Sequence, residues 1–368
     1  MVRFDPGPEL QAALCRDPSI ARDRGDRERP TRVVRPTLQL LAIETSCDET
    51  AAAVVVSGPR CLSNVVRSQD ALHAPFGGVV PELAARAHLQ LLVPVVERAL
   101  DKAGVRWENI DGLAVTRGPG LIGCLLVGVN LAQAIGWARA LPVAGISHLA
   151  GHLYAAQLED PAIMPPALGL IVSGGHSDLV RWHGDRSIEV IGRTRDDAAG
   201  EAFDKGARIL GLPFPGGPAI DRLAADGDAR AVAFPRPRAP GLDFSFSGVK
   251  TALLYDVRKR GPISDQVRAD LAASYQEAIV DALLSRVEAA FAAAPAPTII
   301  LGGGVARNRR LREAAQARLG SLARLVIPAP ELCTDNAAMI GAAALAGAGS
   351  LNPDWVPFDA DPGLGFAG

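Results

Sequence analysis

Cysteine is scarce in this 368-residue chain, and its few cysteines follow no recognisable pattern. There are five of them, an odd number, scattered from Cys15 to Cys333 without one C-x-x-C pair. A disulfide framework needs paired cysteines in a short chain, and a thiolate zinc site needs closely spaced ones. We therefore expect neither, and a reducing, cytoplasmic location fits best.

The chain also lacks a large net charge and a convincing membrane segment. Its formal net charge is -2, so no general basic field draws in nucleic acid, and any RNA must meet a local basic patch. The longest uncharged run, residues 118–138, has the length of a membrane span, but proline, glycine and amide side chains interrupt it. We predict a buried helix there and no membrane contact.

Strand and helix patterns alternate from Leu38 onward. A hairpin is predicted over 38–56 and another over 168–182, each with an apolar strand, a small polar turn and a second strand. Helical segments over 81–103 and 197–210 follow the two hairpins. This repetition predicts an α/β protein with two similar lobes that face one cleft.

Domain boundaries follow from the same pattern. We predict one lobe over 37–147, a second lobe with helical insertions over 148–347, and a tail over 348–368. Residues 1–36 are rich in Arg, Asp and Pro and show little apolar periodicity, which predicts a flexible extension. Six acidic residues in that extension argue against a mitochondrial presequence, and no secretory apolar segment occurs in it.

Two histidines four residues apart, His148 and His152, are the strongest candidate for chemistry. On a helix this spacing puts both imidazoles on one face, where they can share a metal ion. The zinc-protease signature needs a general-base Glu directly after the first His, and Leu149 stands there instead. Histidines at this spacing also occur as an ordinary core or surface pair, so the spacing alone leaves both interpretations open.

Glycine-rich turns form a second candidate site. Ser-Gly-Gly follows an apolar strand at 173–175, three glycines follow another at 302–304, and a glycine pair stands at 216–217. The N–H groups of such turns can surround a phosphate, and a helix that begins near Asn308 favours an anion at its start. Each turn alone is most often only a tight turn, but together they favour nucleotide binding.

Further stretches complete an ordered pattern along the chain: 44–50 (ETSCDET), 77–86 (GGVVPELAAR) with His88, 118–121 (GPGL), 148–152 (HLAGH), 172–177 (VSGGHS), 196–205, 244–250 (FSFSGVK), 303–308 (GGVARN) and 333–336 (CTDN). Together they resemble the tRNA adenosine threonylcarbamoyltransferases, the bacterial TsaD family formerly known as glycoproteases or O-sialoglycoprotein endopeptidases. The resemblance extends from about Leu38 to Gly347 without a missing block. Many separated motifs in register are more specific than any one of them.

The resemblance implies a fold, a reaction and partners. The fold is the two-lobed actin-like ATPase fold with duplicated ribonuclease-H-like domains. The reaction is an acyl transfer from threonylcarbamoyl-AMP to the N6 amine of adenosine 37, next to the anticodon, in tRNAs that read codons beginning with A, with release of AMP. The partners are a TsaB-like paralogous subunit and a TsaE-like small ATPase.

The resemblance also implies which residues form the site. It adds Asp335 to His148 and His152 as ligands of one divalent ion, Fe²⁺ or alternatively Zn²⁺. From the local pattern alone, Asp335 would instead be the N-cap of a helix over 336–346. The donor pocket carried over from the family consists of Ile171, Val172, Ser173, Gly174, Gly175, Asp204, Gly217, Asp221 and Asn308.

The first polar turn, which contains Thr45, Ser46, Asp48 and Glu49, occupies the place where actin-like ATPases hold phosphate. Its carboxylates would repel a phosphate unless a metal ion lay between them. We expect them to face the threonyl part of the donor or the incoming tRNA amine, and we include Asp48 among the catalytic residues. A capped hairpin turn without a role in catalysis is the alternative.

Two surface elements are predicted to bind partners. The Arg-rich segments 307–310 with Arg312, and 258–260, are candidates for contacts with tRNA, although solvated helix ends would look the same. Segment 82–103 is a candidate docking helix for the paralogous subunit, and Pro94 should kink or split it. Simple core packing is the alternative for its apolar residues: Leu83, Leu91, Leu92, Val95 and Leu100.

Three other functions compete with the transferase. A metalloendopeptidase would need the missing Glu after the first histidine. A sugar-kinase-like phosphotransferase would share the fold, but no Asp base pairs with a basic phosphate loop in this sequence. A noncatalytic assembly subunit would need neither ligand residues nor nucleotide loops, and this chain retains both.

Overall fold

A computed structural model describes most of the chain: residues 37–184, 187–236, 239–349, 351 and 357–366. The predicted extension over 1–36 lies outside these residues. Four of the five cysteines are described, and all four are free, as expected for a chain without a disulfide framework.

Two five-stranded sheets with the same strand order form the framework. The first has the order β3-β2-β1-β4-β5 and the second β8-β7-β6-β9-β10. In each, the first three strands of the chain pair antiparallel and the last two join in parallel, which confirms the predicted duplication. The strands are β1 (Gln39–Glu44), β2 (Glu49–Val56), β3 (Arg60–Ser68), β4 (Gly112–Gly118), β5 (Val143–Ser147), β6 (Ala167–Val172), β7 (Ser177–Trp182), β8 (Ile188–Arg193), β9 (Thr298–Gly302) and β10 (Arg324–Val326).

The two predicted hairpins form equivalent parts of the two sheets. β1 and β2 are joined by the turn at 45–48, and β6 and β7 by the turn at 173–176. The strands β1 and β6 are buried along almost their whole length, in agreement with their nearly unbroken apolar sequences. Polar side chains therefore gather where these two strands end.

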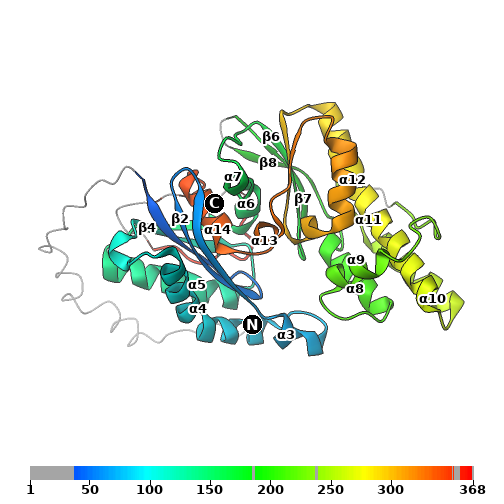
Figure 1. Cartoon of the computed structure of the whole chain (residues 1–368), viewed down its shortest axis with the longest axis horizontal. Coiled ribbons are helices and arrows are strands. Elements are labelled where there is room, and N and C mark those ends of the chain that lie inside the picture. Colours follow the sequence, from blue (N-terminus) through cyan, green and yellow to red (C-terminus); the bar gives the residue numbers. More distant parts are fainter. Residues whose placement is uncertain (1–36, 185–186, 237–238, 350, 352–356, 367–368) are drawn as a thin grey trace, which may run out of the picture. The chain divides into compact units, whose positions relative to one another are not determined.

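Helices pack on both faces of the first sheet. Figure 1 shows α4 and α5 on one side of β2 and β4, and α14 on the other. The helices up to the end of β5 are α3 (Asp70–His73), η1 (Ala74–Phe76), α4 (Pro81–Ala103), η2 (Trp107–Asn109) and α5 (Ile122–Arg139). Those that follow are α6 (His148–Tyr154), α7 (Ala156–Glu159), α8 (Ala199–Ile209), α9 (Gly216–Ala224), α10 (Ser247–Arg260), α11 (Asp265–Ala293), η3 (Gly304–Arg307), α12 (Arg309–Leu319), α13 (Pro330–Cys333) and α14 (Ala337–Leu345).

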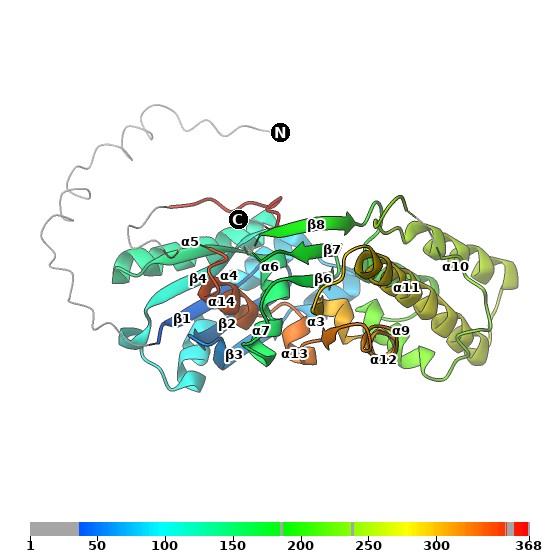
Figure 2. The same cartoon turned by 90° about the horizontal axis from the view of Figure 1, so that it is seen from above.

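Three apolar layers hold the sheets and helices together. One layer packs α4 and α5 on the first sheet, and another packs α8 to α12 on the second. The middle layer contains buried residues of both sheets together with α6 and α14, which occupy the centre of the view in Figure 2. Burying one large aliphatic side chain is worth roughly 1.5–3 kcal/mol. The shared middle layer therefore stabilises the two lobes against each other.

The last helix and the described tail pack on the first sheet. Helix α14 contacts β1 and β2. In the tail, the carbonyl of Phe358 accepts a hydrogen bond from Gln133 at 2.7 Å, and the carbonyl of Gly365 accepts one from Ser147 at 2.7 Å. The chain thus returns to the first sheet after completing the second. The lobe boundaries at 147 and 347 stay a prediction.

Helix α4 decides one of the two alternatives predicted from Pro94, a kinked or a split helix. The helix is continuous over 23 residues, so the proline does not split it, although it removes one main-chain donor. Burial on the sheet offsets that loss. Of the residues predicted to dock a partner, Leu92, Val95 and Leu100 are buried in this core, so core packing explains them.

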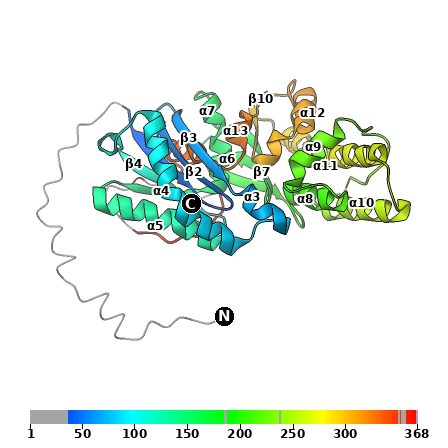
Figure 3. The same cartoon turned by 60° about the horizontal axis from the view of Figure 1, so that its bottom comes forward.

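Helix α5 is less buried than we predicted. Only a third of it is buried, and Ile122 and Leu126 are exposed. Among the described helices it is the one whose length and composition would allow a membrane crossing, a criterion that core helices of water-soluble proteins also meet. Helix α4 packs against α5 and runs beside it in Figure 3.

We expect Leu92→Ala to lower the free energy of unfolding by about 2–5 kcal/mol, because it removes a side chain that is 2% exposed in the core. Leu89→Ala, on the same helix, is the matched control, because Leu89 is 68% exposed. It should change stability by less than about 0.5 kcal/mol. Denaturant unfolding of the two variants measures the difference, and equal losses would contradict the assigned packing of α4.

Candidate functional site

The two histidines of the i, i+4 pair lie side by side at the beginning of α6. Their ring centroids are 4.7 Å apart, and both side chains are buried. Ser147 is the N-cap of this helix, and its side chain accepts a hydrogen bond from the N–H of Ala150. The cap starts the helix at His148, so both imidazoles project from one face, as the spacing predicted.

Asp335 meets both histidines from the other end of the sequence. Its Oδ1 lies 3.5 Å from Nε2 of His148 and 3.3 Å from Nε2 of His152. Asn336, not Asp335, is the N-cap of α14, since its side chain accepts from the N–H of Met339 at 3.1 Å. The capping alternative for Asp335 is therefore wrong, and its carboxylate is free to face the histidines.

Glu44 is a residue of the site that the sequence analysis did not assign. It ends β1, is fully buried, and places Oε2 3.0 Å from Nδ1 of His148. Thr116 donates to the same oxygen at 2.5 Å, and the N–H of Ser46 donates to the other. A carboxylate behind a ligand histidine holds its ring so that the second nitrogen faces the metal position. A lone acid at the end of an otherwise apolar strand could have indicated this role.

The charges of these buried side chains shift one another's pKa values. Burial lowers the pKa of His148, but Asp335 and Glu44 outweigh burial and raise it to about 9. Burial raises the pKa of Asp335, but the two histidines outweigh it and lower it to about 2. For His152, burial lowers the pKa, and burial together with the neighbouring His148 outweighs the opposing effect of Asp335.

These residues fit a divalent metal ion. Among the described residues, His148, His152 and Asp335 form a group whose ligand atoms all lie within 4.8 Å of one another. Among the described residues, both ring nitrogens of His152 are buried without a hydrogen-bond partner, although Oδ1 of Asp335 lies 3.3 Å from Nε2. Buried polar atoms without a hydrogen bond are rare in proteins, so these two nitrogens indicate a binding partner such as a metal ion. Two imidazoles and one carboxylate suit Fe²⁺ or Zn²⁺ and leave coordination positions open.

The acidic first turn lies beside this group. The carbonyl of Ser46 accepts from the N–H of Leu121 at 2.8 Å, and that of Asp48 from Gln69 at 3.0 Å, so neighbouring loops hold the turn. Burial raises the pKa of Asp48, and the charge of Asp335 raises it further. Glu49 is affected in the same way and more strongly. The turn thus brings acidic side chains close to Asp335.

The predicted donor loop, residues 171–175, forms the end of β6 and the turn after it. The N–H of Ser173 donates to the carbonyl of His176 at 2.9 Å, which closes the turn. The carbonyl of Ser173 accepts from the N–H of Gly200 at 3.2 Å, where α8 begins. A Cβ at position 200 would lie 2.5 Å from that carbonyl, so glycine is required for this approach.

Asp204 of α8 is tied to the glycine pair at the start of α9. Its Oδ1 accepts a hydrogen bond from the N–H of Gly216 at 2.7 Å, and the N–H of Gly217 also bonds to it. Burial raises the pKa of Asp204, and the charge of Asp48 in the first turn adds to the effect. The two predicted residues Asp204 and Gly217 therefore lie together.

Asp221 and Asn308 lie together at the start of α12. Asp221 accepts from the N–H of Arg309 at 3.2 Å, and its Oδ1 is buried without a hydrogen bond among the described residues. Asn308 caps α12 and donates to Gln276 at 2.7 Å. Asp221 therefore keeps an acceptor available to a ligand, whereas the side chain of Asn308 is already bonded within the protein.

Three cations of the two predicted basic segments form ion pairs: Arg260 with Asp256, Arg309 with Glu313, and Arg310 with Glu277 at 2.6 Å. Arg312 instead donates to main-chain carbonyls, such as that of Ala306 at 3.1 Å. An ion pair within the protein neutralises the cation and weakens its attraction to the phosphates of a nucleic acid. Over the described ranges, three members of these segments are exposed and form no ion pair: Arg258, Lys259 and Arg307.

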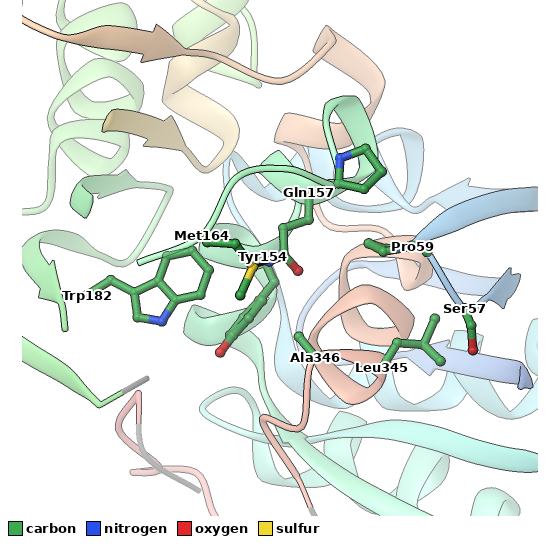
Figure 4. A pocket seen from close by; sticks show the side chains of 10 residues that line it. Ser57, Pro59, Tyr154, Gln157, Met164, Trp182, Leu345 and Ala346 are labelled. Carbon is green, nitrogen blue, oxygen red and sulfur yellow. Dashed lines mark hydrogen bonds between the residues drawn. The ribbon is translucent and has the colours of Figure 1, made fainter. Parts of the chain in front are cut away.

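A cavity of about 180 Å³ lies at the other ends of α6 and α14, where Tyr154 and Leu345 line it (Figure 4). Its remaining walls come from the turn after β2, from α7 and the segment after it, from Trp182 of β7 and from Ala346 after α14. None of the predicted site residues lines this cavity. The candidate site is therefore at the N-terminal ends of α6 and α14.

Two matched sheets, with the metal-type group and the glycine loop at their strand ends, define an α/β protein of the actin-like ATPase fold. Two crystal structures of HypF agree with this class. For HypF of T. kodakarensis the TM-score is 0.58 at 13% identity, covering 86% of this chain and 49% of HypF. For full-length HypF in a phosphate- and nucleotide-bound form the TM-score is 0.57 at 12% identity, covering 84% and 55%. Such low identity supports the fold alone.

The chain belongs to the TsaD family of acyltransferases. Residues 60–342 match the family described as TsaD, tRNA N6-adenosine threonylcarbamoyltransferase. The enzyme of that name from Anaeromyxobacter sp. (strain Fw109-5) is 54% identical over 310 residues, which cover 83% of this chain and 93% of the relative. The one from Symbiobacterium thermophilum is 53% identical over 306 residues, covering 83% and 90%. The resemblance found in the sequence is thereby confirmed.

We expect Glu44→Ala to lower the affinity for a divalent metal by about 10- to 100-fold, because it removes the group that orients His148. Competition with a chelating dye measures the affinity, and circular dichroism checks the fold. Glu44→Gln, which keeps the shape and one acceptor, should lose less. Glu189→Ala is the matched control, since Glu189 also bonds a histidine at 3.0 Å but on the surface. Unchanged affinity in Glu44→Ala would exclude this role.

Proposed function

We propose that the protein transfers the threonylcarbamoyl group of threonylcarbamoyl-AMP to the N6 amine of adenosine 37 in tRNAs that read codons beginning with A. AMP is the leaving product. The observation that carries this proposal is the convergence of His148, His152 and Asp335 in a TsaD-family chain that also has the glycine loop 171–175. A cation-binding group and a loop that can hold a phosphate are the two parts that such a transfer needs, and their presence in one chain supports the proposal.

Donor binding is assigned to the second lobe. The loop 171–175 offers main-chain N–H groups to the phosphate, and the N-terminal ends of α9 and α12 favour the same negative charge. Asp204 and Asp221 accept hydrogen bonds from the ribose hydroxyls, and the buried, unbonded Oδ1 of Asp221 supports that role. Full-length HypF has the same fold and was crystallised in a phosphate- and nucleotide-bound form. The fold is therefore compatible with binding of a nucleotide.

The chemistry needs positioning more than it needs activation. The donor is a mixed anhydride of a carbamic acid and a phosphate, so it already contains a good leaving group. The amine of adenosine is the nucleophile, and no side chain has to take that role. The protein therefore acts by holding both substrates and stabilising negative charge that develops on the donor.

The metal position is assigned to His148, His152 and Asp335, with Fe²⁺ preferred and Zn²⁺ as the alternative. When bound, the ion supplies Lewis-acid polarisation of donor oxygens. Glu44 keeps the ring of His148 in the orientation this requires. The buried environment strengthens these electrostatic contacts because it excludes water.

The acidic turn is assigned to the side of the site where the amine enters. Burial and the nearby charge of Asp335 raise the pKa of Asp48. The negative charge of Asp335 disfavours a donor phosphate on this side of the site. Its carboxyl group hydrogen-bonds the threonyl part of the donor or the tRNA amine. The carboxylates of this turn would in either case repel a misplaced phosphate.

Binding of the tRNA phosphates is assigned to exposed cations that form no ion pair within the described residues. Arg258, Lys259 and Arg307 are exposed and unpaired among the residues the structure describes, in a chain whose net charge is -2. Each cation that neutralises a phosphate strengthens binding in a way that salt weakens. The protein would act in the cytoplasm, where unmodified tRNA is present.

A TsaB-like paralogous subunit is assigned to the face formed by α4 and α5. On this α4–α5 face, Leu89 and Val93 of α4 and Ile122 and Leu126 of α5 are exposed. The two helices pack closely, since a Cβ at Gly123 would lie 3.3 Å from the Cβ of Ala85. Contiguous exposed apolar side chains are typical of a protein interface. A TsaE-like small ATPase would join the same complex.

Reconstitution with threonylcarbamoyl-AMP and unmodified tRNA tests the proposed reaction. We expect His148→Ala to reduce transfer by at least about 100-fold, since a Lewis acid is worth several kcal/mol and each 1.4 kcal/mol is tenfold in rate. Chelation of the native enzyme should have the same effect. His183→Ala is the matched control, because His183 is an exposed histidine. Full transfer by His148→Ala would refute the metal site, and no transfer by the native complex would refute the function.

Binding of the paralogous subunit tests the docking face. We expect Leu89→Asp combined with Val93→Asp to weaken the complex by about 30-fold or more, because apolar anchors of an interface are worth about 2 kcal/mol or more. Both residues are exposed, so the fold should be retained. Leu322→Asp, another exposed leucine, is the control. Titration calorimetry measures the affinities, and equal affinity in all three proteins would exclude this face.

A further inference from the structure

None of the roles assigned above involves the described tail, residues 357–366, which lies outside the matched family region 60–342. The end of the tail is nevertheless buried: Leu364 is 9% exposed and Phe366 is 6% exposed. Phe366 belongs to the middle apolar layer, together with residues of α6 and α14. The tail therefore packs in the same layer as the helix that begins with His148.

The first contact of the tail with the site is made through Ser147, which directly precedes His148. The hydroxyl of Ser147 donates to the carbonyl of Gly365 at 2.7 Å and accepts from the N–H of Ala150 at 3.4 Å. A hydroxyl group can do both at once, because it has one proton and two lone pairs. This side chain thus joins the tail to the N-cap of α6, where the helix and its first histidine begin.

The second contact is made through the loop that follows β4. The N–H of Asp361 donates to the carbonyl of Arg117 at 2.9 Å. A Cβ at Gly118 would overlap the carbonyl of Asp361, so only glycine permits this approach. On the other side of the loop, a Cβ at Gly120 would lie 2.6 Å from the carbonyl of Ser46. The loop is therefore held between the tail and the acidic first turn.

Both contacts lead to the ring of one proposed ligand, His148. Its Nδ1 lies 3.0 Å from Oε2 of Glu44 and 3.2 Å from Oγ of Ser46. The loop after β4 supports Ser46, and Ser147 supports the start of the helix. Contacts of this kind behind a ligand fix the direction in which its second nitrogen points. The imidazole is thus restrained from two sides, and the tail contacts both restraints.

Protection of a sheet edge is the other role open to the tail. Strand β5 is an edge of the first sheet, and a Cβ at Gly145 of β5 would lie 2.9 Å from the ring of Phe358. Loops commonly cover such edges. Edge protection accounts for Phe358, but Asp361 and Gly365 make their contacts at the ends of β4 and β5, on the side where His148 follows.

We propose that the tail is a positioning element of the metal group. Residues 361–366 hold Ser147 and the loop after β4, and through them they hold the ring of His148. This inference rests on the proposed function, which places a metal ion at His148, and it assigns a role to a segment that contains no ligand. Loss of the tail leaves every ligand in the chain but orients His148 less well, so the metal ion binds more weakly.

The test compares the Zn²⁺ affinity of the native protein with that of a protein truncated after Leu351, of Phe366→Ala and of Ser147→Ala, each by competition with a chelating dye. We expect truncation to weaken binding by about 10- to 100-fold and the two substitutions to weaken it less. Ser147→Thr keeps the hydroxyl and should stay within about threefold of the native affinity. A synthetic peptide of residues 357–368 should restore most of the affinity of the truncated protein.

Three further measurements separate positioning from a general loss of stability. Leu283→Ala removes a fully buried side chain of α11, so it should lower stability but leave Zn²⁺ affinity within about threefold. The visible spectrum of bound Co²⁺ reports coordination geometry, and it should change in the truncated protein but not in Leu283→Ala. Truncation combined with Ser147→Ala should lose less affinity than the product of the two separate losses, because both break one contact.

Each contrary result has its own meaning. Native affinity in the truncated protein and in both substitutions would overturn the proposal and leave edge protection as the role of the tail. An equal loss in Leu283→Ala would also overturn it, because affinity would then follow stability alone. If circular dichroism shows that the truncated protein is unfolded, Phe366→Ala and Ser147→Ala decide by the same criteria. Absence of Zn²⁺ binding by the native protein would instead refute the metal position of the proposed function.

Discussion

The contact between Glu44 and His148 is the interaction on which the rest of the site depends. A fully buried carboxylate is costly unless hydrogen bonds and an opposite charge surround it, and Glu44 has both. Its partner His148 is the first residue of α6. Asp335, which lies 3.5 Å from His148, directly precedes the N-cap of α14. Those two helices form the layer shared by both sheets. The electrostatics of the site and the packing of the lobes therefore constrain each other.

The duplicated sheets supply the same local geometry twice, with different chemistry. In the first lobe a Cβ at Gly120 would lie 2.6 Å from the carbonyl of Ser46, and in the second a Cβ at Gly303 would lie 2.3 Å from that of Val172. Each lobe thus uses a glycine to bring a loop against the polar turn after its first strand. One turn is acidic and lies by the metal group, whereas the other is rich in glycine and suits a phosphate. In the proposed function, the first turn meets the acceptor amine or the threonyl group, and the second meets the donor phosphate.

Local patterns predicted much of this accurately. The two hairpins, the helix at 81–103 and the histidine pair on one helical face follow from periodicity and spacing, which depend on neighbours in the sequence. The errors arose where a residue's environment is set by distant segments. Pro94 does not split α4, because packing on the sheet supports the helix. Asp335 is not a cap, because Asn336 is adjacent and takes that place. The exposure of Ile122 and Leu126 on α5 likewise depends on how α5 packs against other elements of the fold.

The sequence by itself determined the family, the duplicated α/β plan and the residue types available for a metal and a nucleotide. Only the tertiary structure decided which of those residues meet. Glu44 and His148 are separated by 104 positions, and Asp335 is still further along the chain. No local rule links them, because their proximity results from strand order and from α6 and α14 packing between two sheets. For the same reason, only the tertiary structure shows that both ring nitrogens of His152 are buried without a hydrogen-bond partner among the described residues.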